Sequence, residues 1–157
     1  MDFGKMFSSS WKFAALVAVV WGVVAGVIGL IPLVNVIALL VIIPVGFVLP
    51  VVLGFLSTKS FAGEKPFELA ESFVNGGVAG LIYGLAGGIV GVIFSALGLV
   101  LGIGVTAATG DPTSAAVAGG AGIIGLILFA VIGIPMSMVM SAVLSGIGGA
   151  IYSVIKK

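Results

Sequence analysis

The side chains most capable of chemistry in this sequence are three methionines at alternate positions, Met136, Met138 and Met140. Thioether sulfurs are soft ligands that suit Cu(I), so a ring of them across subunits could conduct this ion. Alternate residues of a helix point about 200° apart, however, so one helix cannot direct all three sulfurs at one ion. Methionine also fills irregular gaps beside glycine and proline. We therefore interpret the three as packing residues and predict no metal site.

The carboxylates indicate no catalytic site either. Glu64, Glu68 and Glu71 lie in one polar segment, and the chain contains no histidine and no cysteine to pair with them. At a spacing of three, Glu68 and Glu71 share a helix face, where acidic side chains near a helix start interact favourably with its dipole. Asn35 and Asn75 are predicted near opposite membrane surfaces, so they share no polar site. Because no nucleophile is paired with a base, we predict no enzyme activity and no cofactor.

Composition decides the class of protein. Of 157 residues, 61% are hydrophobic and 7% are charged, too few charged side chains to cover a water-soluble domain of this length. Three tracts, 13–58, 72–110 and 112–155, contain no charge, and each exceeds the ~20 residues that a helix needs to cross a bilayer. The tracts are apolar at both odd and even positions, unlike the strands of a membrane β-barrel. We therefore predict an all-α integral membrane protein.

Interruptions of the apolar tracts predict a four-transmembrane-helix bundle, made of two helical hairpins, 11–57 and 73–157, in one domain. The predicted helices are 11–31, 36–57, 73–105 and 115–155, with breaks at 32–35 and 109–114. The polar segment 58–72 is predicted to end in a short helix on the membrane surface. The last tract is long for one span and contains Pro135, so five spans are the alternative.

The distribution of charge predicts the orientation. With four spans, all six lysines lie on one side of the membrane, and the turn that holds Asp111 lies on the other. The positive-inside rule then places both termini in the cytoplasm of a multi-pass cell-membrane protein. The first tract is too long for the apolar core of a signal peptide, so we expect an uncleaved anchor. A formal net charge of +1 gives no reason to expect nucleic acid as a partner.

Small residues recur at every fourth position of the predicted spans, so each series lines one helix face. Membrane helices use such faces for close backbone approach, because no hydrophobic drive brings helices together in lipid. The predicted helix-packing residues are Gly22 and Gly26 in the first helix, Gly76, Gly80, Gly84 and Gly88 in the third, and Ser137, Ser141, Ser145 and Gly149 in the last. We expect packing inside the bundle, with the lipid bilayer and a homo-oligomer or membrane-complex subunit as partners.

A shift of 62 residues aligns the first helix with the third. The matched positions include Trp21 with Tyr83, Gly22 with Gly84 and Gly26 with Gly88. If this similarity reflects a duplication, the two hairpins share one orientation and are related by an axis along the membrane normal, as in parallel transporter repeats. Chance similarity between two helices rich in glycine, alanine, valine and isoleucine is the alternative.

Short stretches of the first half carry a resemblance to a known family. They are the opening MDFGK at 1–5, IPLVN at 31–35, and FEL at 67–69, which leads into GLIY at 80–83. They are similar to an uncharacterised, largely archaeal family of small polytopic membrane proteins. The resemblance implies a prokaryotic cytoplasmic membrane and assigns no activity and no site residues.

No acidic or basic side chain is predicted inside the membrane, although proton pumps, voltage sensors and most ion-coupled carriers require one there. Our leading hypothesis is a non-enzymatic structural or accessory subunit, or a homo-oligomer, packed through small-residue helix faces. The alternative is a small passive channel or facilitator for an uncharged or weakly hydrated solute. Ser137, Ser141 and Ser145 are the candidate polar stripe of such a channel.

Overall fold

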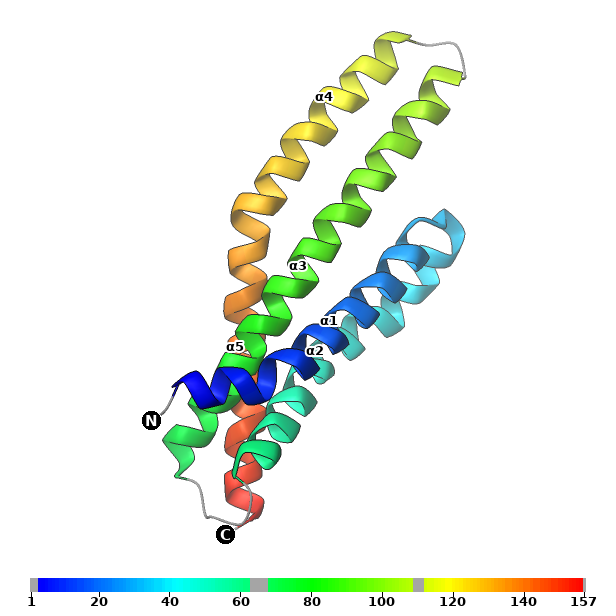
Figure 1. Ribbon diagram of the computed structural model, residues 1–157. Helices are drawn as coiled ribbons and strands as arrows, with labels where there is room; N and C mark the ends of the chain where they lie inside the picture. Colours follow the sequence, from blue (N-terminus) through cyan, green and yellow to red (C-terminus); the bar gives the residue numbers. More distant parts are fainter. Residues whose placement is uncertain (1–2, 63–67, 109–111, 157) are drawn as a thin grey trace.

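The protein consists of long helices that run side by side. The computed structural model describes residues 3–62, 68–108 and 112–156. The helices are α1 (Phe3–Gly29), α2 (Pro32–Ala62), α3 (Leu69–Ala108), α4 (Pro112–Leu128), the π-helical turn η1 (Phe129–Gly133) and α5 (Ile134–Ile155) (Figure 1). Because α4, η1 and α5 are continuous, the described ranges contain four helical rods, each long and apolar enough to cross a membrane. The prediction of an all-α protein with four spans is confirmed.

The π-helical turn explains how Pro135 is accommodated within the last rod. In η1 the backbone N–H of Ile134 donates to the carbonyl oxygen of Phe129, five residues earlier. A proline ring inside a regular α-helix clashes with the carbonyl four residues before it, which here belongs to Val131. The wider turn lies directly before Pro135 and includes Val131, so the helix changes pitch and does not end. The last tract therefore forms one rod.

Several helix ends differ from the sequence-based expectation. The first helix begins at Phe3, eight residues before the predicted start. Pro32 opens α2 and does not belong to a four-residue break, since proline suits the first helical turn, where its missing N–H needs no partner. α2 continues to Ala62 and α3 begins at Leu69. The predicted surface helix is therefore the first turn of α3, while 63–67 and 109–111 lie outside the described residues.

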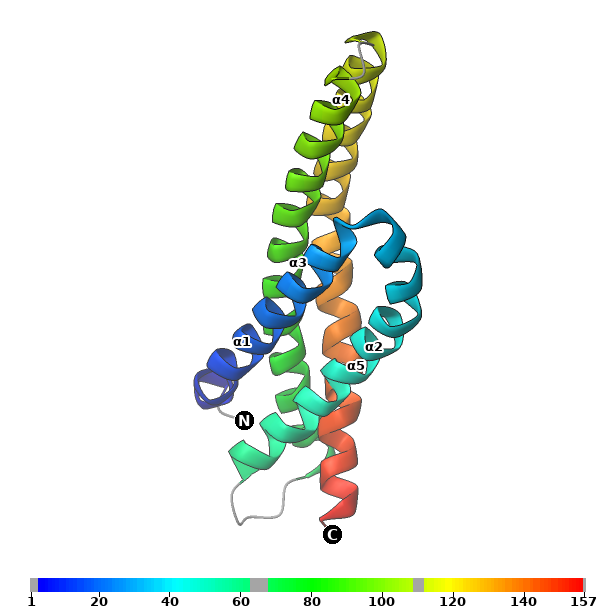
Figure 2. The ribbon, with the colours of Figure 1, turned by 90° about the vertical axis from the view of Figure 1, so that its right-hand side faces the viewer.

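The helices are arranged around one close pair, α3 and α5. The most extensive contact in the bundle is between these two helices, while α1 packs mainly on α3 and α2 mainly on α5. α1 and α2 lie on one side of the pair and meet each other less closely (Figures 1 and 2). Both views show α3 and α4 continuing well beyond the connection between α1 and α2. The chain termini lie together at the opposite end.

Three glycines of α3 allow the close approach of α5. A Cβ atom at Gly76 or Gly80 would overlap a backbone carbonyl oxygen of α5, and one at Gly84 would lie 2.6 Å from a backbone Cα. The opposing residues are Ser145, Ser141 and Met138, respectively. Backbone atoms cannot move aside as flexible side chains do, so only glycine fits these positions. We call these contacts the glycine seam.

The small residues of α1 serve a different contact. Ala14 and Ala18 are fully buried in the core, whereas a Cβ at Gly22 would meet the side chain of Val90 at 2.8 Å. Gly26 lies against the ring of Phe94 in the same way. α1 thus receives side chains of α3 on its small-residue face. On the matching face of α3, Gly84 meets backbone of the last rod, while Gly88 meets the side chain of Ile134. The aligned positions of the two hairpins do not have equivalent environments.

Substitution at the glycine seam should separate α3 from α5. We expect Gly84→Leu to lower the free energy of unfolding by about 3 kcal/mol or more, because the side chain would have to displace helix backbone. The measurement is unfolding in mixed micelles with increasing denaturing detergent. Gly87→Leu is the matched control, since no described atom lies within 4 Å of its Cβ position. Equal stability of the two variants would contradict the seam.

Candidate functional site

A groove of about 500 Å³ lies between α1, α3 and α5. We call it the central groove. Eight of its seventeen lining residues are glycine, and aromatic rings come from Trp21, Tyr83 and Phe94. No acidic or basic side chain lines it. Apolar hollows of this size with a few polar groups are the usual form of a small-molecule site.

The groove arises from the spacing of glycine on two neighbouring helices. On α1 and α3 the glycines recur at intervals of three or four residues, so they lie on one face of each helix. At Gly29 and Gly87 no described atom lies within 4 Å of the Cβ position. The two faces meet where Val90 and Phe94 of α3 contact Gly22 and Gly26 of α1, and they stand apart at Gly29 and Gly87. The same small residues therefore produce contact at one level and a hollow at another.

Three hydroxyl groups line the groove near its inner end. Ser137 Oγ donates to the carbonyl oxygen of Gly84 across the glycine seam at 3.1 Å and lies 2.8 Å from that of Ile134. Tyr83 and Ser141 are each only 8% exposed, and neither forms a hydrogen bond to another side chain or backbone group of the described residues. Buried hydroxyls are normally paired. Among the buried hydroxyls of the groove, those of Tyr83 and Ser141 thus have unused hydrogen-bonding capacity.

Apolar side chains close the inner end of the groove. Ala14 and Ala18 of α1, Leu53 of α2, and Ala79 and Tyr83 of α3 form one buried cluster. Ala18 and Tyr83 belong both to this cluster and to the groove wall. The groove is therefore separated from the bundle end that carries the termini.

A second feature, the polar cluster, joins all four rods near that end. Its members are Ser10 of α1, Ser57 and Thr58 of α2, Ser72 and Asn75 of α3, and Ser145 of α5, and each is at most 6% exposed. The hydroxyls of Ser10 and Ser57 share a hydrogen bond of 2.5 Å. Asn75 Nδ2 donates to Thr58 Oγ1 at 3.4 Å and to Ser57 Oγ at 3.5 Å. The last two distances exceed the usual range, so these bonds are weak.

The polar cluster is incompletely satisfied. Thr58 Oγ1 donates to the carbonyl oxygen of Ser72 at 3.3 Å. Among the described atoms, Ser72 Oγ, Asn75 Oδ1 and Ser145 Oγ have no partner. Each buried polar group without a partner costs about 1–3 kcal/mol. The cluster therefore ties the rods together through some of its groups and weakens the bundle through others.

The structure places the candidate functional residues predicted from the sequence in different parts of the molecule. Ser137 and Ser141 line the central groove, whereas Ser145 belongs to the polar cluster, so the three do not form one continuous stripe. Met136 and Met140 are exposed on the outside of the rod. The described residues include no group of three acidic, histidine or cysteine side chains placed to hold a metal.

Sequence reasoning missed the polar cluster. A signal for it existed, because Ser10 lies near the start of α1, Ser57 near the end of α2 and Asn75 near the start of α3. In antiparallel neighbours these positions have the same depth in the membrane. From the sequence, Asn75 is compared only with Asn35, which is predicted near the opposite membrane surface. Comparison of each polar residue with those at equal depth would have found the cluster.

Comparison with known proteins finds no family model, no curated protein and no solved structure that matches the chain. The arguments for function therefore rest on the groove, the polar cluster and the shape of the bundle.

Two serine substitutions in the polar cluster should have opposite effects. Ser57→Ala removes the partner of both Ser10 and Asn75, so we expect a loss of about 1 kcal/mol of stability. Ser72→Ala removes a buried hydroxyl that has no partner among the described atoms, so stability should stay equal or rise by up to about 1 kcal/mol. Unfolding in denaturing detergent measures both. A larger loss for Ser72→Ala than for Ser57→Ala would contradict the described network.

Proposed function

We propose that the chain is a non-enzymatic, multi-pass protein of the cytoplasmic membrane that acts as a structural subunit and associates with a second copy of itself. The observation that carries this proposal is the outer part of α3 and α4. Leu30, which follows α1, lies 3.6 Å from the Cβ position of Gly98, and α3 and α4 continue well beyond the connection between α1 and α2 (Figures 1 and 2). We call residues 99–108 and 112–128 the extension.

The length of α3 supports the need for a partner. Its 40 residues span about 60 Å, twice the ~30 Å thickness of the hydrocarbon core. A tilt of about 60° would be required to place all of it in the core, whereas membrane helices tilt by up to ~40°. Part of this apolar helix therefore extends beyond the hydrocarbon core, where lipid tails cannot shield it and another protein surface is needed.

The side chains of the extension support a partner of the same kind. Val100, Val105 and Val117 are each 67% exposed, and an apolar surface of this extent is unfavourable in water. Gly102 and Gly120 have no described atom within 4 Å of their Cβ positions, so another helix can approach them closely. The extension of a second copy of the chain offers the same apolar side chains and the same small residues.

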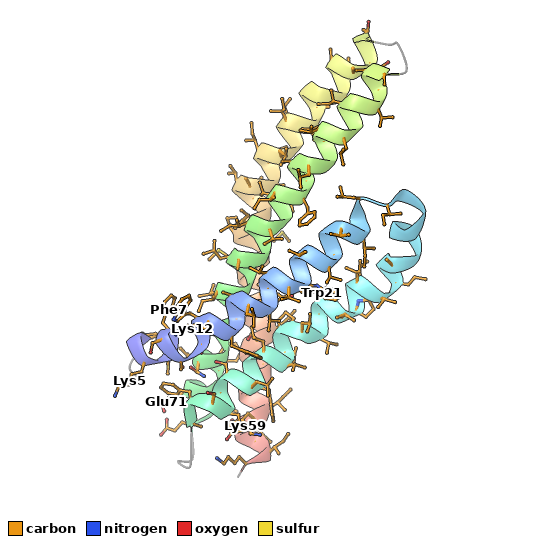
Figure 3. The ribbon with its side chains drawn as sticks, turned by 45° about the vertical axis from the view of Figure 1, so that its right-hand side comes forward. Lys5, Phe7, Lys12, Trp21, Lys59 and Glu71 are labelled. Atoms are coloured by element: carbon orange, nitrogen blue, oxygen red, sulfur yellow. The ribbon has the colours of Figure 1, made fainter. Side chains whose placement is uncertain are left out.

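The lysines support a cytoplasmic position for the termini. Lys5 and Lys12 of α1, Lys59 at the end of α2 and Lys156 after α5 lie at the same end of the bundle; Figure 3 labels the first three of them. Lys12 lies 5.8 Å from the ring of Trp11 and Lys156 lies 5.5 Å from that of Tyr152. Basic and aromatic residues together are typical of the cytoplasmic membrane surface. The resemblance to archaeal membrane proteins also favours a prokaryotic cytoplasmic membrane.

A passive facilitator receives less support. Ser137 and Ser141 line the central groove, as the channel hypothesis requires, but the apolar cluster around Leu53 and Ala79 closes its inner end. Solute flux in liposomes tests this alternative, with Ser141→Leu as the blocked variant.

Disulfide cross-linking tests self-association in a chain that has no cysteine of its own. We expect Val105→Cys or Val117→Cys, in the extension, to give a covalent dimer after mild oxidation in membranes. Val48→Cys is the matched control, since Val48 is 58% exposed on α2 and lies outside the extension. A monomeric mass in nanodiscs without cross-linking at either position contradicts the proposal. Stoichiometric co-purification of a different protein with the monomer indicates an accessory subunit instead.

The orientation can be tested with the same cysteine-free background. Ser60 and Ala108 are exposed at opposite ends of the bundle. A membrane-impermeant maleimide added to intact cells should label Ala108→Cys strongly and Ser60→Cys at least tenfold less. The reverse pattern would place the termini outside. Labelling of both in permeabilised cells serves as the control for reactivity.

A further inference from the structure

We propose that the central groove binds a neutral membrane lipid whose head is a flat ring with carbonyl oxygens, a molecule of the quinone type. This site is independent of self-association through the extension. The proposal rests on the shape of the groove, its two unpaired hydroxyls and its depth in the membrane.

The groove is suited to a flat, apolar molecule. Its walls are largely bare helix backbone, because eight of the lining residues are glycine. Trp21 and Tyr83 add aromatic faces near one end and Phe94 adds one further along. A ring can stack on these faces and lie close to the glycine backbone. A volume of about 500 Å³ falls in the range of sites for ligands of this size.

The hydrogen-bonding groups favour an acceptor. Tyr83 and Ser141 lie within about one helical turn of each other along the bundle, because Gly80 packs against the Ser141 backbone and Gly84 against that of Met138. Both hydroxyls have a proton that is not donated to any described residue. The backbone carbonyls of the helical walls already accept helical hydrogen bonds. The groups with capacity left are the two hydroxyls, which can donate as well as accept, and the indole N–H of Trp21, which can only donate. Carbonyl oxygens of a ligand match these donors.

The position of the groove favours a ligand that arrives through the bilayer. Trp21 lies in the second half of α1, away from Lys5 and Lys12 (Figure 3). It follows Trp11 by ten residues, or about 15 Å of helix, which is half the thickness of the hydrocarbon core. A charged head would be unfavourable at this depth without an ionic partner, and no acidic or basic side chain lines the groove. A lipid with a neutral head and an apolar tail can reach the groove through the bilayer and needs no ionic partner there.

Tryptophan fluorescence can report binding directly. The chain has two tryptophans, so the Trp11→Phe background leaves Trp21 in the groove as the only one. The probe is a decyl-substituted benzoquinone, added to this variant in nanodiscs. We expect quenching that saturates, together with a rise in melting temperature that depends on probe concentration. Quenching that increases linearly without saturation, and no change in melting temperature, would overturn the proposal.

Two matched substitutions separate the groove from general effects of the membrane. Gly87→Phe fills the groove at a position with no described atom within 4 Å, and Gly46→Phe adds the same ring at an equally open position outside it. We expect saturable quenching to disappear in the Gly87→Phe variant and to remain in the Gly46→Phe variant. Equal binding by both variants would exclude the groove.

A separate experiment tests whether the carbonyl oxygens of the ligand contribute to binding. Tyr83→Phe removes one hydroxyl and keeps the ring, so we expect about tenfold weaker binding, the effect of one lost hydrogen bond. Decylbenzene, which has the same tail and no carbonyl, should not compete with the quinone probe. Unchanged binding by Tyr83→Phe together with full competition by decylbenzene would show that the groove accepts apolar tails only, which overturns the assignment of the head group.

Discussion

The direct backbone contact between α3 and α5 is the constraint on which the rest of the structure depends. At Gly76 and Gly80, carbonyl oxygens of α5 occupy the space that a side chain would need. In lipid no hydrophobic force draws two helices together, so close packing and short polar contacts have to supply the attraction. Because the pair is this close, α1 and α2 can rest on it from one side, and the hydroxyl of Ser137 reaches the backbone of Gly84.

The two ends of the bundle differ in how many helices meet there and in the polarity of the side chains between them. Near the termini, where the four rods come together, serine, threonine and asparagine side chains meet in the polar cluster, and Asn75 of α3 contacts both Ser57 and Thr58 of α2. Such contacts between membrane helices contribute about 0.6 kcal/mol on average, so they determine which helices pair more than they stabilise the bundle. Toward the other end the α1–α2 hairpin stops near Gly98, while α3 and α4 continue with apolar side chains such as Val105 largely exposed. One end is thus joined by polar contacts, and the other presents apolar helices to a partner.

Glycine has three distinct roles in this chain, although the residue type is the same. At Gly84 it allows two backbones to touch; at Gly22 it receives the side chain of Val90; at Gly87 it leaves an open space that forms part of the central groove. The difference lies in what stands opposite each glycine. A series of small residues therefore indicates a face that permits close approach, and the neighbouring helix determines whether contact or a hollow results.

The class of protein and a preference for four spans could be predicted from the residues alone. Three uncharged tracts required membrane helices, since eleven charged residues cannot cover a soluble domain of this length, and the lysine distribution favoured four spans over five. The spacing of Gly76, Gly80 and Gly84 predicted a packing face. The helix that meets this face became clear from the folded bundle, as did the π-helical turn before Pro135. The bundle also separates Ser145, which is fully buried near its terminal end, from Ser141, which lines the groove. The physical reason is that periodicity along one helix specifies a direction, whereas contacts depend on the rotation and depth of its neighbours, which the whole bundle determines together.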